Sequence, residues 1–234
     1  MAEEKNIVMN ETIERMFKAG AHFGYSKSRR HPSVKPLIFG AKNKVEIFDL
    51  EKTKEYLDTA KAFVASIAKF NGVILFLGGK NESRDVVRNL ATSIGMPYVA
   101  GRWIGGTFTN FPQIKKRTER LEMLVSQKEK GELSKYTKKE RLLIDREIDT
   151  LNRFFLGIIN MKEMPKALFV VDSKREHIAV TEAHKAKIPV IALVGSDCNI
   201  KEVEYPIPGN DTSVASITFF LSELINAYKD GRKA

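Results

Sequence analysis

The sequence predicts an α/β fold in which an open parallel sheet has helices on both faces and carries an inserted pair of antiparallel helices. Wholly apolar runs at 73–77 and 167–171 are each followed by a polar loop, a helical pattern and a second strand pattern. Such runs are typical of strands buried on both faces of a parallel sheet. The highly charged segment 111–160, between these two β-α-β units, has helical periodicity and predicts the inserted pair.

Length, charge and cysteine content narrow the class of protein. The chain has 234 residues, a formal net charge of +10 and one cysteine, Cys198. The length suits one large domain or two modest ones, and the charge indicates a polyanionic partner, with RNA, DNA and anionic lipid all open on charge alone. A single cysteine forms no internal disulfide, and no apolar run approaches the roughly 20 residues of a membrane span. The polar start at 1–6 resembles neither a signal nor a transit peptide, so we expect a cytoplasmic protein without membrane contact.

The N-terminal part predicts a short helix, a basic loop and a hairpin. Residues 11–18 have helical spacing with Asn10 as the candidate N-cap, and apolar runs at 37–39 and 45–48 flank a basic turn. Between residues 24 and 44 the sequence is basic and contains no acidic residue. This unmixed charge favours contact with a phosphate backbone over a solvated loop. The candidate RNA-binding residues of this zone are Lys27, Arg29, Arg30, Lys35, Lys42 and Lys44.

The remaining elements are predicted from the periodicity of apolar residues and from the glycine, asparagine and proline residues that end or interrupt them. Helices are predicted at 51–70, 82–93, 175–185 and 212–228. Asn71 and Gly72 end the first of these helices. Two prolines within 205–211 predict a stiff extended connection, and the end of the chain at 231–233 is expected to fray.

The inserted segment predicts an antiparallel coiled-coil hairpin. Apolar residues repeat at heptad spacing in its second half, at Ile144, Ile148, Leu151, Phe155 and Ile158, and 130–135 reads as a turn. We therefore expect a sheet domain at 1–110 and 161–234 and a protruding hairpin at 111–160. A second basic cluster, Lys115, Lys116, Arg117 and Arg120, lies at the hairpin base, although a charged helix face is usually only solvated.

A glycine-rich stretch at 101–111 precedes the hairpin and contains the only tryptophan of the chain. Its glycines suit a backbone that needs positive φ or close approach. Arg102 offers a guanidinium for phosphate and Trp103 a ring for base stacking. Alternatively, Trp103 fills the core and Arg102 meets a local carboxylate, and the stretch by itself does not decide between these roles.

Signals of catalysis are weak. The sequence lacks the glycine-rich fingerprints for dinucleotides and for Walker-type phosphate binding, and its histidines are scattered without cysteines at metal-ligand spacing. Glu176 and His177 are adjacent in a predicted helix, where neighbouring side chains point in different directions. We predict no enzymatic activity, no cofactor and no bound metal.

Five stretches together closely resemble the bacterial type of the family of small-subunit ribosomal protein two. They lie at 19–24, 36–40, 101–111, 167–172 and 205–211, and the Arg-Trp-Ile-Gly-Gly and Pro-Ile-Pro-Gly-Asn-Asp sequences are the most specific. The resemblance covers about residues 12–228. It implies a flavodoxin-like sheet domain with a protruding coiled-coil hairpin, no enzymatic activity, and a place between the head and body of the small subunit. It also implies small-subunit ribosomal RNA and neighbouring ribosomal proteins as partners, including docking of ribosomal protein one during translation, and no homo-oligomer.

The leading hypothesis is thus a structural RNA-binding component that works by charge neutralisation and shape fit. An enzyme acting on phosphorylated sugars or nucleotides is the alternative, because related sheet architectures host many such enzymes. A free regulatory RNA-binding protein shares the charge argument, and only its location would distinguish it.

Overall fold

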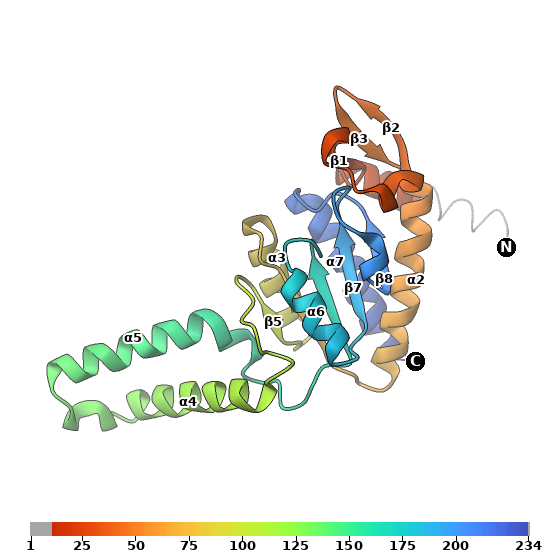
Figure 1. The fold of residues 1–234 in the computed structure, drawn as a ribbon. Helices are drawn as coiled ribbons and strands as arrows, with labels where there is room; N and C mark the ends of the chain where they lie inside the picture. Colours follow the sequence, from red (N-terminus) through yellow and green to blue (C-terminus); the bar gives the residue numbers. More distant parts are fainter. Residues whose placement is uncertain (1–10, 234) are drawn as a thin grey trace.

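The computed structural model describes residues 11–233 and contains two sheets and a long helical hairpin (Figure 1). The strands are β1 Phe23–Ser26, β2 Ile38–Lys42, β3 Val45–Phe48, β4 Ile74–Leu77, β5 Tyr98–Val99, β6 Ala167–Val171, β7 Val190–Val194 and β8 Tyr205–Pro208. The α-helices are α2 Leu50–Lys69, α3 Asn81–Thr92, α4 Phe111–Glu129, α5 Lys138–Phe155, α6 His177–Lys185 and α7 Val214–Lys233, and residues 11–18 are also helical. Short 3-10 segments lie at Lys27–Arg29, Pro32–Leu37, Glu132–Lys135, Leu156–Ile158 and Ile200–Glu202. Within the described part of the chain, no helix is both long and apolar enough to cross a bilayer.

The larger sheet has five parallel strands in the order β5-β4-β6-β7-β8. Counted along the chain within this sheet, the order is 2-1-3-4-5, which is the flavodoxin-like order. The predicted α/β fold class is therefore confirmed. The direction of winding reverses between β4 and β6, and in such sheets the carboxyl ends of the two strands at the reversal border a crevice.

Alternate residues of the central strands face two separate cores, as the pleat of a strand requires. Phe169 of β6 packs in the core that α2, α3 and α7 cover. Its neighbours Leu168 and Val170 pack in the second core, to which α6 and the hairpin base contribute. Figure 1 shows the resulting three layers, with α6 on one face of the sheet and α2 and α7 on the other.

The smaller sheet is antiparallel, with the order β1-β3-β2. The predicted hairpin of β2 and β3 is present, and its turn consists of Asn43 and Lys44 at φ values of 51° and 67°. Positive φ at both central residues is the requirement of a type I′ turn. The basic loop that was expected between the first helix and the hairpin is not only a loop, because it includes β1, which pairs with β3. The proposed N-cap Asn10 lies outside the described residues.

Helices α4 and α5 lie side by side and project away from the larger sheet (Figure 1). Leu121 and Leu124 of α4, and Ile148 and Leu151 of α5, are buried between them or toward the sheet. Thr137 begins α5 with a reciprocal capping box to Glu140. Two ion pairs also connect the helices: Arg120 to Glu147 at 3.1 Å, and Lys128 to Asp145 at 2.7 Å.

The C-terminal part differs from the prediction in two places. Residues 205–208 form strand β8, which pairs in parallel with β7, where an extended connection was expected. Pro206 and Pro208 are compatible with this strand because it lies at the sheet edge. Helix α7 continues to Lys233, so the predicted fraying at 231–233 is wrong; Gly231 is buried where α7 crosses α2.

Candidate nucleic-acid interface

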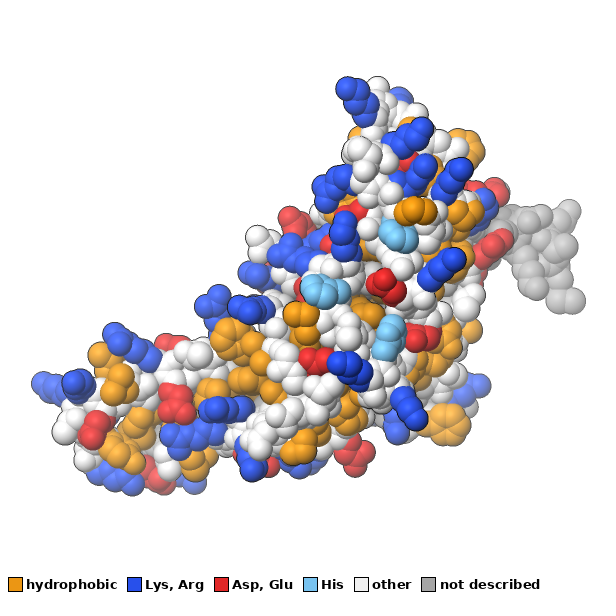
Figure 2. All heavy atoms as spheres, viewed as in Figure 1, with side chains coloured by type: hydrophobic (Ala, Val, Ile, Leu, Met, Phe, Trp, Pro, Cys, Tyr) orange, Lys and Arg blue, Asp and Glu red, His pale blue; other side chains and the backbone are white. Residues whose placement is uncertain are grey.

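The smaller sheet and the segment that connects β1 to β2 present unpaired lysines. Lys27, Lys35, Lys42 and Lys44 are exposed, and none of them is within 4.0 Å of a carboxylate in residues 11–233. The tight turn at Asn43 and Lys44 places two of them at the tip of the β2–β3 hairpin. Figure 2 shows Lys and Arg side chains gathered over these strands. Four of the six candidate residues of this zone are therefore free to meet an anion.

The two arginines of the zone have protein partners. Arg30 donates to the carboxylate of Glu46 at 2.8 Å, and Glu46 is buried on β3. Arg29 lies over the Tyr25 ring at 4.4 Å from its centroid and makes a looser ion pair with Asp197 at 3.5 Å. More than half of the Arg29 side chain remains exposed, whereas that of Arg30 is 21% exposed. Arg29 therefore remains a candidate for RNA contact, and Arg30 mainly stabilises β3.

The glycine-rich stretch wraps around a buried carboxylate. Glu182 of α6 accepts hydrogen bonds from the backbone nitrogens of Gly106 at 2.7 Å and Phe108 at 3.0 Å. The indole nitrogen of Trp103 points at the same carboxylate from 3.5 Å, and its ring meets Phe108 edge-on. Backbone N–H groups of one loop thus converge on a single buried carboxylate, which fixes the path of the chain here.

This environment decides between the two roles of Trp103. Its side chain is only 6% exposed and belongs to the core beneath α6, so it offers no face on which a base can stack. The expectation that Trp103 contacts RNA is corrected: it fills the core. Arg102 next to it is exposed and has no carboxylate within 4.0 Å in the described chain, so it remains a candidate.

The second basic cluster lies on the first turns of α4. Lys115, Lys116 and Arg117 are exposed and, over the described residues, without a carboxylate partner. Arg120 differs, since its Nε and Nη2 donate to the two carboxylate oxygens of Glu147 of α5. Three of the four predicted residues of this cluster are thus available to an anion, and Arg120 links the two helices of the hairpin.

A buried ion-pair network, which the sequence did not indicate, joins the carboxyl ends of three strands. Lys80 follows β4 and is 7% exposed; its ammonium group lies 2.8 Å from Asp172, after β6, and 2.6 Å from Asp211, after β8. Burial opposes the charge of Lys80, but the two carboxylates outweigh it and raise the pKa of Lys80. Burial likewise opposes ionisation of Asp172, but Lys80 lowers its pKa below the ordinary value.

Three groups beside this network, Cys198, Glu176 and His177, differ in burial. Burial and the nearby Asp172 raise the pKa of the Cys198 thiol to about 12, so it is not a thiolate nucleophile at neutral pH. Glu176 is buried, and the loss of water raises its pKa to about 7. His177 is exposed and approaches the carbonyl of Lys174. Across residues 11–233, no three His, Cys, Asp or Glu side chains are arranged to hold a metal ion.

Comparison with known proteins gives one consistent result. The family model described as "Ribosomal protein S2" matches residues 16–231. A protein of Nitratiruptor sp. called "Small ribosomal subunit protein uS2" is 39% identical over 222 residues, covering 95% of this chain and 83% of the relative. Proteins with the same description from Sulfurimonas denitrificans and Corynebacterium urealyticum are 40% and 41% identical, covering 94% and 95% of this chain and 85% and 83% of the relatives.

Proposed function

Because the chain belongs to the ribosomal protein S2 family, we propose that it is a structural constituent of the small ribosomal subunit and binds small-subunit ribosomal RNA. The observation that carries RNA binding is the set of exposed, unpaired basic side chains in the two predicted zones. They are Lys27, Lys35, Lys42, Lys44, Arg102, Lys115, Lys116 and Arg117. The chain that carries these charges belongs to a family whose named members are proteins of the small ribosomal subunit.

The chemistry of these groups fits the phosphate backbone. Lysine and arginine side chains displace the counterions that surround RNA, and this release supplies affinity without reading sequence. The zones lie on different elements, with Lys42 on β2 and Lys115 on α4. Their separation suits one RNA surface of fixed shape better than a small ligand. Shape fit and charge neutralisation together then define the binding mode.

The finer assignments rest on the family resemblance and are part of the same proposal. The protein sits between the head and body of the small subunit of cytoplasmic ribosomes, as a single copy, and supports docking of ribosomal protein one. The hairpin at 111–160 is a unit distinct from the sheet domain at 1–110 and 161–234. No catalytic step is assigned to the chain, because the charged groups at the strand ends are paired with one another.

Sedimentation of a cell lysate through a sucrose gradient tests the ribosomal assignment. The wild-type chain is expected to migrate with small subunits and to be released at high salt, because phosphate contacts weaken with ionic strength. A chain that stays at the top of the gradient would exclude the structural role. This result would leave a free regulatory RNA-binding protein as the alternative.

A pair of matched variants tests the basic zone in the same gradient. Lys27→Gln with Lys42→Gln removes two unpaired charges from the zone and should lower subunit occupancy. Lys69→Gln with Lys229→Gln removes the same charge from exposed positions on α2 and α7 and should leave occupancy unchanged. Equal occupancy of the two variants would remove this zone from the interface while leaving the ribosomal assignment intact.

A further inference from the structure

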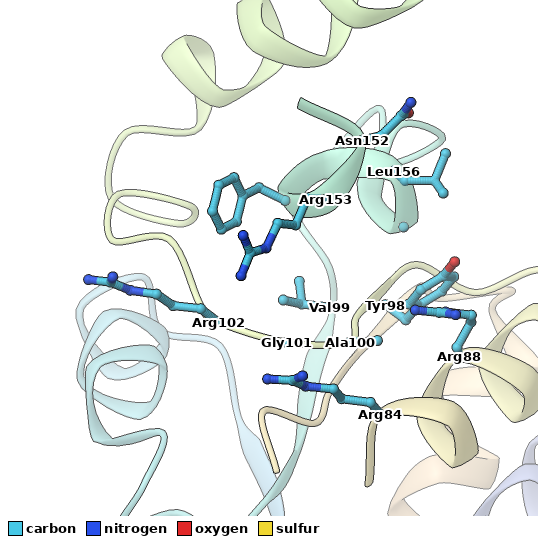
Figure 3. Close-up of a pocket in the computed structure, with 12 residues that line it drawn as sticks. Arg84, Arg88, Tyr98, Val99, Ala100, Gly101, Arg102, Asn152, Arg153 and Leu156 are labelled. Atoms are coloured by element: carbon cyan, nitrogen blue, oxygen red, sulfur yellow. The ribbon is translucent and has the colours of Figure 1, made fainter. Parts of the chain in front are cut away.

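A cleft of about 710 Å³ lies between α3, the segment after β5 and the end of α5. Four arginines from these three places line it: Arg84 and Arg88 of α3, Arg102 after β5, and Arg153 of α5. Figure 3 shows Arg84 and Arg153 on opposite sides of the Gly101–Arg102 segment. Only Arg102 belongs to the basic zones already described, so the cleft is a separate feature.

The positive charge of the cleft is not balanced by the protein. No acidic residue lines the cleft. Within the described chain, Arg84, Arg102 and Arg153 have no carboxylate within 4.0 Å, and Arg88 has only a long, exposed contact to Asp85 at 3.7 Å. Like charges around one concavity repel one another, and a bound anion removes that repulsion. The arginine fork moreover matches phosphate oxygens in a bidentate manner.

The rest of the lining suits the other parts of a nucleotide. Tyr98 and Phe154 contribute aromatic rings, and Asn152 contributes a side-chain amide. The ring of Tyr98 packs directly against Gly157, where an added Cβ would lie 2.8 Å from two ring atoms and would also meet the Tyr98 carbonyl oxygen. Glycine at 157 therefore allows the end of α5 to approach β5 and sets the shape of the cleft.

We propose that this cleft binds a nucleotide of single-stranded RNA, with the arginines on its phosphates and its base against the part of the lining that the half-buried Tyr98 and Phe154 contribute. The inference rests on the proposed function and deepens it by naming a specific subsite. A single-stranded segment fits because a base must be unstacked to enter a concave site. Basic side chains also lie over the smaller sheet and along the hairpin (Figure 2). A polymer can contact these further charges together with the cleft, whereas a free mononucleotide cannot.

Fluorescence anisotropy with the full-length protein tests the subsite, using a labelled uridine oligoribonucleotide of about 12 residues, which is within the usual site size for single strands. Arg84→Gln with Arg153→Gln should weaken binding about tenfold or more, because two charge-assisted contacts are lost. The slope of log affinity against log salt should become shallower by about 1.4, since each phosphate contact contributes about 0.7 for single strands.

Lys69→Gln with Lys229→Gln is the matched control, since it removes two exposed charges on α2 and α7. The control should keep nearly the wild-type affinity and slope. Arg84 and Arg153 are both exposed, so the variant that replaces them by glutamine should fold. A thermal melt of that variant checks this. Arg84→Lys with Arg153→Lys keeps the charge and should restore the salt slope, but only part of the affinity, because the bidentate geometry is lost.

The other outcomes distinguish this inference from the proposed function. If the wild type binds the oligonucleotide and the cleft variant matches the control, the subsite is overturned and the ribosomal assignment stands. If uridine 5′-monophosphate competes as well as the oligonucleotide, the site is one for free nucleotides and the RNA inference is overturned. If the wild type does not bind the oligonucleotide, the inference also fails, and the sucrose gradient alone decides the proposed function.

Discussion

The carboxylate of Glu182 lies 2.7 Å from the backbone nitrogen of Gly106, so a side chain of α6 fixes the loop that leads into the helical hairpin. Gly106 has a φ of 94°, which favours glycine and turns its N–H toward the carboxylate. The same carboxylate accepts from Phe108. The position of the hairpin base therefore depends on a residue 76 positions later in the chain.

Glu182→Ala should destabilise the protein by about 2–4 kcal/mol, because buried backbone donors lose a charged acceptor. Urea unfolding followed by Trp103 fluorescence measures this directly, since the indole lies beside the carboxylate. Glu122→Ala removes an exposed carboxylate of α4 and should change the midpoint little. Equal midpoints for the two variants would contradict the anchoring role of Glu182.

Lys80→Met should cost about 3–5 kcal/mol at neutral pH, because it leaves Asp172 and Asp211 buried without their counter-charge. The cost should shrink in acid as the carboxyl groups become protonated. Chemical denaturation across pH measures both effects.

Lys54→Met breaks an exposed pair with Asp58 on α2 and should cost no more than about 0.5 kcal/mol. Adding Asp172→Asn and Asp211→Asn to Lys80→Met should recover part of the lost stability, because no buried charge then remains unpaired. A triple variant weaker than the single one would show that the buried charges are not the cause.

Glu176→Gln should stabilise the protein at alkaline pH. Burial raises the pKa of Glu176 to about 7 from an ordinary value of 4.5. The native state thus binds a proton more tightly than the unfolded chain, so stability from this group is full below pH 4.5 and is lost as the pH rises through 7. The glutamine side chain remains neutral, and the gain should be about 2–3 kcal/mol near pH 8.5 and small near pH 5. A gain that is independent of pH would contradict this explanation.

Gly231→Ala should destabilise the protein although alanine is the better helix former. Helix propensity favours alanine by about 1 kcal/mol, but overpacking costs about 1–3 kcal/mol. The added Cβ would lie 2.7 Å from the carbonyl oxygen of Ala65 and 2.8 Å from its Cα, and backbone atoms cannot move aside easily. Thermal unfolding should show a lower midpoint, whereas Asn226→Ala, exposed on the same helix, should raise it slightly. Two raised midpoints would mean that α2 and α7 separate at little cost.

Local sequence patterns were sufficient to predict the central strands and the long helices. The runs at 73–77 and 167–171 were assigned as doubly buried strands, and β4 and β6 are buried along their whole length because helices cover both faces. Helix α2 begins where its apolar stripe begins, and Asp49 caps it by accepting from two backbone nitrogens. In these segments, burial and periodicity indicate the same structure.

Features that depend on distant partners were missed. Strand β1 has only four residues and contains Gly24 and Ser26, and β8 contains two prolines, so neither has a clear strand pattern of its own. Each strand exists because a neighbouring strand pairs with it. Lys80 lies 131 positions from Asp211, and Arg30 was grouped with free cations because Glu46 lies just beyond the basic run. The cleft was missed for the same reason, since Arg84, Arg102 and Arg153 line one cleft only when the end of the hairpin packs against β5.

The prolines of β8 also have a consequence for the edge of the larger sheet. The backbone N–H of Gly209 donates inward to the carbonyl oxygen of Val194 in β7. Because successive backbone nitrogens of a strand face opposite sides, the nitrogens of Pro206 and Pro208 face away from the sheet. Proline has no N–H, and another chain therefore cannot extend the sheet by pairing along this edge. At the opposite edge, β5 has only two residues, which is too short a template for strand addition. Both edges of the larger sheet are thus protected against strand addition from another chain.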